Sequence, residues 1–186
     1  MAQPQPATLP HYTLSEYLTL ERYSDVKHEY LDGLIVAMTG ATKAHDIVTT
    51  NLGTILANHL RGTPCRVAGS DLKLFVEAAN RCFYPDLMVV CSDPHVGNPY
   101  QETDARLIVE VLSESTAEYD QTVKRDTYLL LSSLQEYWLV PQEQAEIIVW
   151  RRVGQRWESH CYRPSDTVPM LGGELTVPVA ALYERL

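Results

Sequence analysis

The chain has 186 residues, 45% of them hydrophobic, which predicts one domain with a sizeable core. Its formal net charge of −9 argues against an obvious nucleic-acid binder, because contacts to phosphate need clustered Lys and Arg side chains. Acidic residues gathered around a metal site also make the formal charge of a protein negative. A divalent ion bound there reverses the local field, so such a site can still attract phosphate. The charge therefore weakens the expectation of nucleic-acid binding and leaves it open.

The start of the chain carries no targeting signal. Residues 1–12, with Pro4, Pro6 and Pro10, predict a flexible N-terminal leader, and residues 13–186 predict the domain. Neither a signal peptide nor an apolar run long enough to span a bilayer is present, so we expect a cytoplasmic protein without membrane contact.

The cysteines lack the spacing of a metal site or a redox motif. We therefore expect them to be reduced, buried and inert, as in a cytosolic protein. They are Cys65, Cys82, Cys91 and Cys161.

The first half of the domain alternates helical and strand patterns. Thr13 and Glu16 have the spacing of a capping box, which predicts a short helix. Asp32-Gly33 divides residues 28–38 into two strands of a hairpin. Apolar residues then recur at helical spacing over residues 47–60. Strands are expected within residues 66–69, 71–76 and 85–91, and a loop over residues 92–105.

The second half continues with a strand, a helix and further strands. Residues 107–112 predict a strand buried on both faces, and Asp120, Lys124 and Tyr128 fall on one face of a following helix. Residues 136–140 and 145–152 look like paired strands, with more β-structure and a helical turn near Leu182 after them. This order predicts an α/β domain with a mixed sheet.

Two acids stand in strands that are otherwise built for burial. Glu110 lies inside the apolar run, where an unpaired carboxylate costs several kcal/mol, so it needs a metal ion, a cation, a donor or a strand end near solvent. Asp86 follows Pro85 at the head of another apolar strand. If the two strands are neighbours, both carboxylates converge at one end of the sheet, and such oxygen ligands suit Mg²⁺ or Mn²⁺.

Four segments in this order resemble the putative restriction endonuclease family Uma-two, within the PD-(D/E)XK nuclease superfamily. They are Tyr84-Pro85-Asp86, Glu110-Val111-Leu112-Ser113, Asp120-x-x-x-Lys124 and Glu136-Tyr137-Trp138-Leu139-Val140. The resemblance covers roughly residues 13–180. It implies a single α/β domain with a restriction-endonuclease-like mixed central β-sheet flanked by α-helices, and a divalent-metal-dependent endonuclease that hydrolyses DNA phosphodiester bonds.

The resemblance also implies roles for individual residues. Asp86 and Glu110 would ligate the ion, with the backbone carbonyl of Val111 as a third oxygen. The superfamily pattern places a lysine two residues after the second acid, where this chain has Leu112, and the family places it on the following helix, at Lys124.

Further expectations from the resemblance concern the early acid and the assembly. Glu29 matches an early acid of the family that would add a ligand or hold a water at the ion. His45 also has a counterpart, without a defined role. DNA is the expected substrate, and a homodimer is expected because two-fold DNA sites favour one.

Structural alternatives stay open for each of these residues. Asp86 could bond nearby backbone, and Glu110 could pair with a buried Arg or Lys. Lys124 could be a helix-surface partner of Asp120, and Glu29 could be a cross-strand charge. His45 could be a helix-start or hydrogen-bonding histidine. Asp120 is placed outside the core site. The alternative function is a catalytically inactive module of the nuclease fold that binds nucleic acid or a protein partner, and a hydrolase of another phosphate ester is a third.

Overall fold

A computed structural model describes residues 10–186 of the chain. The leader expected over residues 1–12 therefore lies mostly outside the described residues. Its last residue, Tyr12, donates its backbone N–H to the carbonyl of Gly33 at 2.9 Å, so this point of the chain is attached to the first hairpin.

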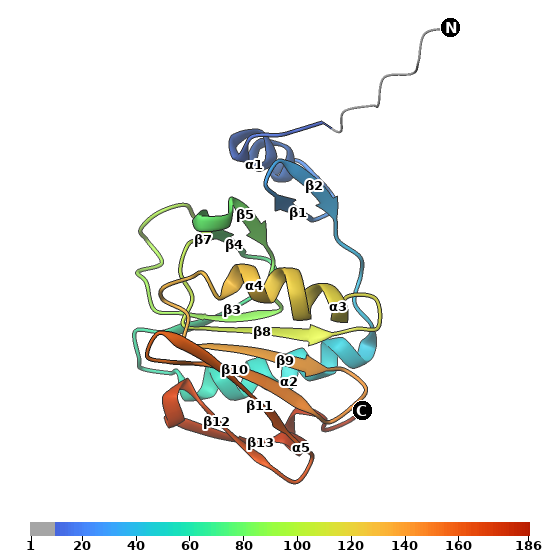
Figure 1. Ribbon diagram of the computed structural model, residues 1–186, viewed down its shortest axis with the longest axis vertical. Helices are drawn as coiled ribbons and strands as arrows, with labels where there is room; N and C mark the ends of the chain where they lie inside the picture. The colour runs from blue at the N-terminus through green and yellow to red at the C-terminus, as the bar shows by residue number, and fades with distance from the viewer. Residues whose placement is uncertain (1–9) are drawn as a thin grey trace, which may run out of the picture.

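The upper part of the molecule is a five-stranded sheet with the order β2-β1-β5-β4-β7 (Figure 1). Helix α1 (Leu14–Arg22) packs on its outer face through Tyr17, whose ring stacks on Tyr30 at 5.2 Å. The strands are β1 (His28–Leu31), β2 (Leu34–Ala37), β4 (Lys73–Val76), β5 (Arg81–Phe83) and β7 (Gln101–Glu102), and the short 3-10 helix η1 (Glu77–Ala79) joins β4 to β5.

The lower part is a six-stranded mixed sheet with the order β11-β10-β9-β8-β6-β3. Strands β8 and β9 are parallel and the other neighbours are antiparallel, which confirms the predicted mixed sheet. Its strands are β3 (Arg66–Gly69), β6 (Leu87–Val90), β8 (Leu107–Leu112), β9 (Glu136–Pro141), β10 (Ile147–Val153) and β11 (Arg156–Tyr162).

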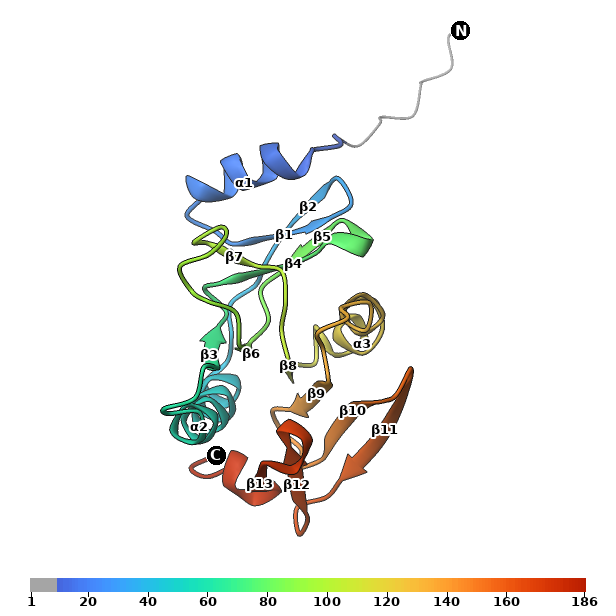
Figure 2. The same ribbon diagram turned by 90° about the vertical axis from the view of Figure 1, so that its left-hand side faces the viewer.

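Both faces of the six-stranded sheet are covered. One face packs against helix α2 (Lys43–His59) and the C-terminal segments, which are β12 (Thr167–Met170), the 3-10 helix η3 (Leu171–Gly173), β13 (Leu175–Pro178) and α5 (Val179–Leu182). The other face packs against a helical segment made of α3 (Ala117–Tyr119), the π-helical turn η2 (Asp120–Lys124) and α4 (Arg125–Tyr128). Figure 2 shows this helical segment between the two large sheets.

Local sequence signals explain several element boundaries. Thr13 and Glu16 form the predicted capping box at the start of α1. Asp32 and Gly33, with φ of 47° and 98°, form the tight turn between β1 and β2, where Leu31 lies opposite Leu34. Helix α2 begins at Lys43 because the Thr42 side chain accepts the backbone N–H of His45.

Two expectations about local structure are corrected. The segment 92–105 is not entirely a loop, since Gln101–Glu102 pairs in parallel with β4. The helix after β8 contains the π-helical turn η2, which keeps both Asp120 and Lys124 buried on the side that faces the sheets.

The prediction that all cysteines are reduced and buried is wrong for the described chain. Cys65 and Cys91 form a disulfide, and Cys161 is exposed. Cys65 precedes β3 and Cys91 follows β6, and the antiparallel register of these strands brings the two residues opposite each other. Cys82 is a free thiol and is buried, and burial raises its pKa to about 12.

Disulfides are uncommon in reducing compartments, so the cytoplasmic location stays a prediction. Among the helices of residues 10–186, none is both long and apolar enough to cross a bilayer.

Candidate active site

Asp86 and Glu110 lie side by side at one end of the six-stranded sheet. Strands β6 and β8 are antiparallel neighbours with Leu87 opposite Val109, so the residue before β6 reaches Glu110. The Asp86 backbone N–H lies 3.4 Å from Glu110 Oε2, and the Val111 N–H donates to Asp86 Oδ2 at 2.7 Å. Asp86 and Glu110 are therefore neighbours, as expected, and the structural alternative that Asp86 bonds nearby backbone is present as well.

The expected buried strand around Glu110 is also confirmed. Every residue of β8 is buried, and Glu110 is 2% exposed. Burial raises the pKa of Glu110 well above its usual range; the charges of Asp86 and Asp120 raise it further, while Lys124 opposes the shift. The pair with Lys124, anticipated as the structural alternative, is present, with Nζ 3.2 Å from Glu110 Oε1.

Lys124 reaches the strand end from the helical segment, but it is not a surface residue. It is 6% exposed, and its Nζ lies 3.2 Å from Glu29 Oε1 and 3.1 Å from Asp120 Oδ1 as well as beside Glu110. Burial disfavours the ammonium ion, but the charges of Glu110, Glu29 and Asp120 prevail and raise the pKa of Lys124 well above its usual range. Lys124 is therefore held in its charged form.

Glu29 comes to the site from the five-stranded sheet. It is 5% exposed, and its Oε2 accepts the Tyr119 hydroxyl proton at 3.1 Å. The residue opposite Glu29 on β2 is Val36, so the structural alternative of a cross-strand charge has no charged partner on that strand. The site therefore joins both sheets through Glu29 and Lys124.

His45 lies in the first turn of α2 and contacts Asp86. Its Nε2 is 3.1 Å from Asp86 Oδ2, and its Nδ1 is 3.4 Å from the Thr49 hydroxyl. The hydrogen bond with Asp86 raises the pKa of His45 above its usual value, although burial opposes this shift. The backbone of His45 lies at the helix start and its ring forms hydrogen bonds, as the structural alternative expected, and the ring contacts the candidate ligand Asp86.

Three further residues of the cluster were not assigned to the core site from sequence. Asp120, 2% exposed, contacts Lys124; Tyr128 donates its hydroxyl to Glu110 Oε1 at 2.8 Å; and Tyr119 binds Glu29. Asp120 and Tyr128 could have been placed from their i, i+4, i+8 spacing with Lys124, because this spacing aligns the three residues on one helical face.

The oxygen atoms of Asp86 and Glu110 fit a hard divalent ion. Asp86 Oδ2 is engaged by Val111 and His45, while among the described residues no hydrogen bond reaches Asp86 Oδ1. Glu110 Oε2 accepts only the long bond from Asp86. Within residues 10–186, no group of three or more His, Cys, Asp or Glu side chains is arranged to hold an ion by itself. Two carboxylates suit Mg²⁺, which retains waters and also binds substrate phosphate.

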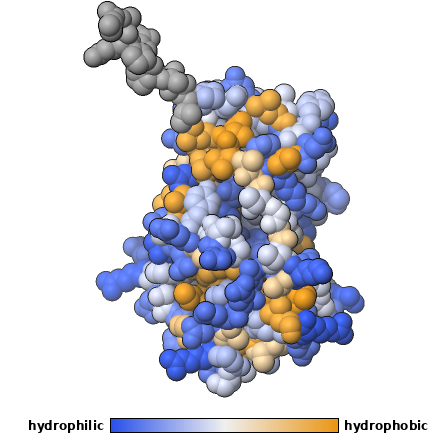
Figure 3. Space-filling model, turned by 90° about the vertical axis from the view of Figure 1, so that its right-hand side faces the viewer, coloured by the Kyte–Doolittle hydropathy of each residue, from blue (hydrophilic) through white to orange (hydrophobic). Residues whose placement is uncertain are grey.

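The side of the molecule that carries these strand ends is mostly hydrophilic. In Figure 1 the ends of β8 and β9 and the start of α2 lie at the right. Figure 3 views that side, where the larger apolar patches lie in the upper and lower parts. The middle of this face is suited to a polar or charged ligand.

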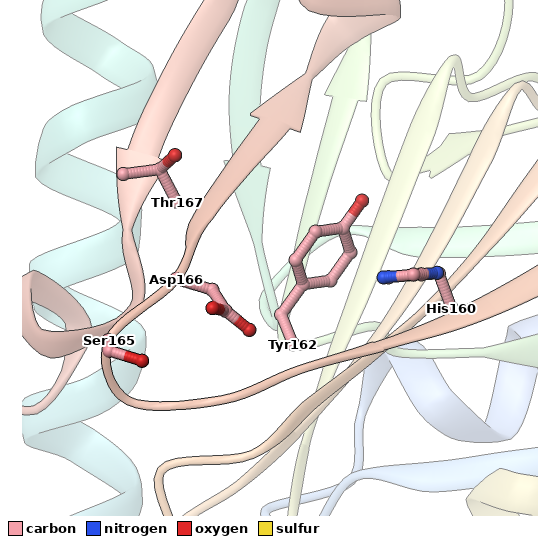
Figure 4. A pocket seen from close by; sticks show the side chains of 5 residues that line it. All are labelled: His160, Tyr162, Ser165, Asp166 and Thr167. Atoms are coloured by element: carbon pink, nitrogen blue, oxygen red, sulfur yellow. The ribbon is translucent and has the colours of Figure 1, made fainter.

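A separate hollow of about 450 Å³ lies on the surface near β11 and β12 (Figure 4). Its lining residues are His160, Tyr162, Ser165, Asp166 and Thr167. It contains one acid, Asp166, whose Oδ2 accepts the Arg163 backbone N–H, so it lacks the paired carboxylates of the site at β6 and β8.

The chain is similar to known proteins over nearly its whole length. The Uma2 family model, described as a putative restriction endonuclease, matches residues 14–180. The uncharacterized protein slr1290 of Synechocystis sp. is 34% identical over 181 residues, which cover 97% of this chain and 95% of the relative. A second Synechocystis protein, sll1609, is 33% identical over 152 residues, covering 81% and 86% of the two chains.

A solved structure shares the fold. The crystal structure of a putative nuclease belonging to DUF820 from Anabaena variabilis aligns with a TM-score of 0.75 at 19% identity, covering 92% of this chain and 97% of that chain. The single-domain, mixed α/β architecture of this chain matches the fold of that protein. From the family model and the Synechocystis relatives together, the chain belongs to the Uma2 family of putative restriction endonucleases.

Proposed function

We propose that the protein is a divalent-metal-dependent endonuclease that hydrolyses DNA phosphodiester bonds. The observation that carries this proposal is the convergence of Asp86 and Glu110 at adjacent strand ends, with the Lys124 ammonium 3.2 Å from Glu110. In this reaction water adds to phosphorus, and the bond from phosphorus to a sugar oxygen breaks.

Each residue has a role that its position supports. Asp86 and Glu110 would hold Mg²⁺ or Mn²⁺ through Oδ1 and Oε2, with the Val111 carbonyl as a third oxygen. The ion supplies Lewis acidity at the phosphate and makes water a stronger nucleophile. Lys124 adds a fixed positive charge that stabilises negative charge developing on the reacting phosphate.

The start of α2 favours an anionic substrate at the same place. The helix begins at Lys43, two residues before His45, so the positive end of its dipole lies near Asp86. The Lys43 side chain is exposed there and is available to a DNA phosphate. This local positive charge favours a phosphate at the start of α2 although the chain as a whole is negative.

Calorimetric titration with Mn²⁺ tests the proposal before any substrate is known. EDTA-treated native protein is expected to bind Mn²⁺, and Asp86→Ala and Glu110→Ala are expected to abolish binding while circular dichroism shows them folded. Glu118→Ala removes an exposed acid from the helical segment that carries Lys124, and this variant serves as the control. Binding that is indifferent to both acids, with and without DNA present, would refute the proposal.

Nicking of supercoiled plasmid DNA is the second test. Native protein with Mg²⁺ or Mn²⁺ should nick the plasmid, and the two alanine variants should not. A catalytically inactive module would instead leave the plasmid intact and keep its partner binding in both variants, so the same set of proteins separates the two functions.

A homodimer remains part of the proposal. Strand β2 is an edge of the five-stranded sheet, and its Leu34 and Val36 side chains are exposed. Sedimentation equilibrium measures the self-association directly, and a monomer at micromolar concentration would contradict this part of the proposal alone.

A further inference from the structure

The inner half of the acidic cluster already contains a cation. Glu29 Oε1, Glu110 Oε1 and Asp120 Oδ1 surround Lys124 Nζ at 3.2, 3.2 and 3.1 Å. All four of these side chains are almost fully buried. Three acids from three different elements, β1, β8 and η2, thus converge on one ammonium group.

The two oxygens of Glu110 separate this inner pocket from the outer carboxylate pair. Oε1 accepts from Lys124 and from the Tyr128 hydroxyl, while Oε2 lies toward the backbone of Asp86. Glu110 therefore stands between two positions for a positive charge, one filled by Lys124 and one beside Asp86.

Two buried oxygens show that the pocket is organised around charge. Among residues 10–186, Glu29 Oε1 and Asp120 Oδ1 are buried and receive no hydrogen bond of good geometry. Both nevertheless lie within 3.2 Å of Lys124 Nζ. They are directed at a cation centre, since the contact to the ammonium is what compensates their burial.

We propose that Lys124 is the resident cation of this inner pocket and that the site therefore takes one divalent ion, on the Asp86 side of Glu110. The inference rests on the proposed metal-dependent function. Mg²⁺ requires oxygens at about 2.0–2.1 Å, and the ammonium already occupies the point between the inner oxygens. Glu29 and Asp120 are then positioning residues for Lys124, in contrast to the expectation that Glu29 adds a ligand or holds a water at the ion.

Mn²⁺ stoichiometry tests the one-ion limit. Native protein should bind one Mn²⁺, and Glu29→Gln should still bind one with an affinity within about 10-fold, the lower end of losses caused by residues that only support ligands. Lys124→Met, which keeps side-chain length without charge, should bind a second Mn²⁺, and the double variant Lys124→Met/Glu29→Gln should lose it. Two ions in the native protein, one ion in Lys124→Met, or loss of all binding in Glu29→Gln would overturn the proposal.

A metal-free measurement separates this inference from the proposed function. In EDTA, Lys124→Met should lower the urea midpoint of unfolding, because it leaves buried carboxylates without a counter-charge. Asp120→Asn added to Lys124→Met should recover part of that loss, and additive effects of the two substitutions would contradict the resident-cation role. Absence of Mn²⁺ binding in the native protein would refute the metal-dependent function, while the EDTA series still decides the role of Lys124.

Discussion

Two buried glutamates on neighbouring strands show how differently the same side chain is used. Glu110 on β8 and Glu136 on β9 are each 2% exposed, and the strands are parallel, with Leu107 opposite Glu136 and Glu110 opposite Leu139. Glu136 therefore lies at the beginning of its strand and Glu110 near the end of the adjacent one, at opposite ends of the sheet.

The carboxylate of Glu136 is surrounded by N–H donors from neighbouring parts of the fold. Its Oε2 accepts the Trp138 indole N–H at 2.9 Å, its Oε1 accepts the Gly172 backbone N–H at 2.9 Å, and Arg151 Nε lies 3.7 Å away. Gly172 belongs to η3, so this carboxylate attaches the C-terminal hairpin to the sheet. Its contacts explain its burial through structure alone.

Glu110 is instead grouped with other acids. Asp86 and Asp120 act on it with like charge, and a single ammonium group compensates three carboxylates. Such an arrangement costs stability and is typical of a functional site. Burial of an acid therefore does not distinguish a structural role from a functional one, whereas the charge of the neighbouring side chains does.

Among substitutions that test the difference between Glu110 and Glu136, the largest expected effect is the effect of Glu110→Gln on DNA cleavage. Glu110→Gln should reduce plasmid nicking by about 10² or more, because it removes the charge that holds the ion and pairs with Lys124. The free energy of unfolding should change by less than about 1 kcal/mol, since like-charge repulsion with Asp86 and Asp120 is relieved at the same time. Nicking assays and urea unfolding measure the two quantities, and full activity in this variant would break the distinction.

Glu136→Ala should show the opposite behaviour. The free energy of unfolding should fall by about 3 kcal/mol, because the Trp138 and Gly172 N–H groups lose their buried acceptor. Activity per folded molecule should be unchanged. Urea unfolding measures the loss of stability, with Glu174→Ala as control. Glu174 is an exposed acid paired with Arg106, so its removal should lower the free energy of unfolding by less than about 1 kcal/mol. A loss below that of the control would mean that Glu136 does not support the hairpin.

A smaller effect is expected at His45. His45→Ala should weaken Mn²⁺ binding about 10-fold, because the ring orients Asp86 through Oδ2. The His45→Gln variant keeps a side-chain N–H and should recover part of the affinity, and the exposed His95→Ala should have no effect. Calorimetry measures all three, and unchanged affinity in His45→Ala would remove His45 from the site.

Much of the fold was predictable because its signals are local. The capping box at Thr13, the Asp32-Gly33 turn and the apolar spacing of α2 each depend on residues within a few positions of one another. The strands β8 and β9 were recognisable as continuous apolar runs, since both of their faces are covered. The π-helical turn and the short strand β7 were not, because tertiary contacts determine them.

The site was predictable in part. Asp86 and Glu110 stood out as acids in apolar strands, and family resemblance selected Lys124 and Glu29. Asp120 was assigned outside the site, because an acid four residues before a lysine is also what an ordinary exposed ion pair looks like. The disulfide was missed because Cys65 and Cys91 lie 26 positions apart and meet only through the pairing of β3 with β6.

The sequence by itself determined most of the elements, the mixed α/β class and the acids that would have to find partners, because hydrophobic periodicity and turn chemistry act over short distances. Only the tertiary structure decided which partners they found. Glu29 and Lys124 come from segments far apart in the chain and meet at 3.2 Å because the helical segment packs between the two sheets. Compensation of charge depends on distances of a few ångströms, and packing alone sets those distances.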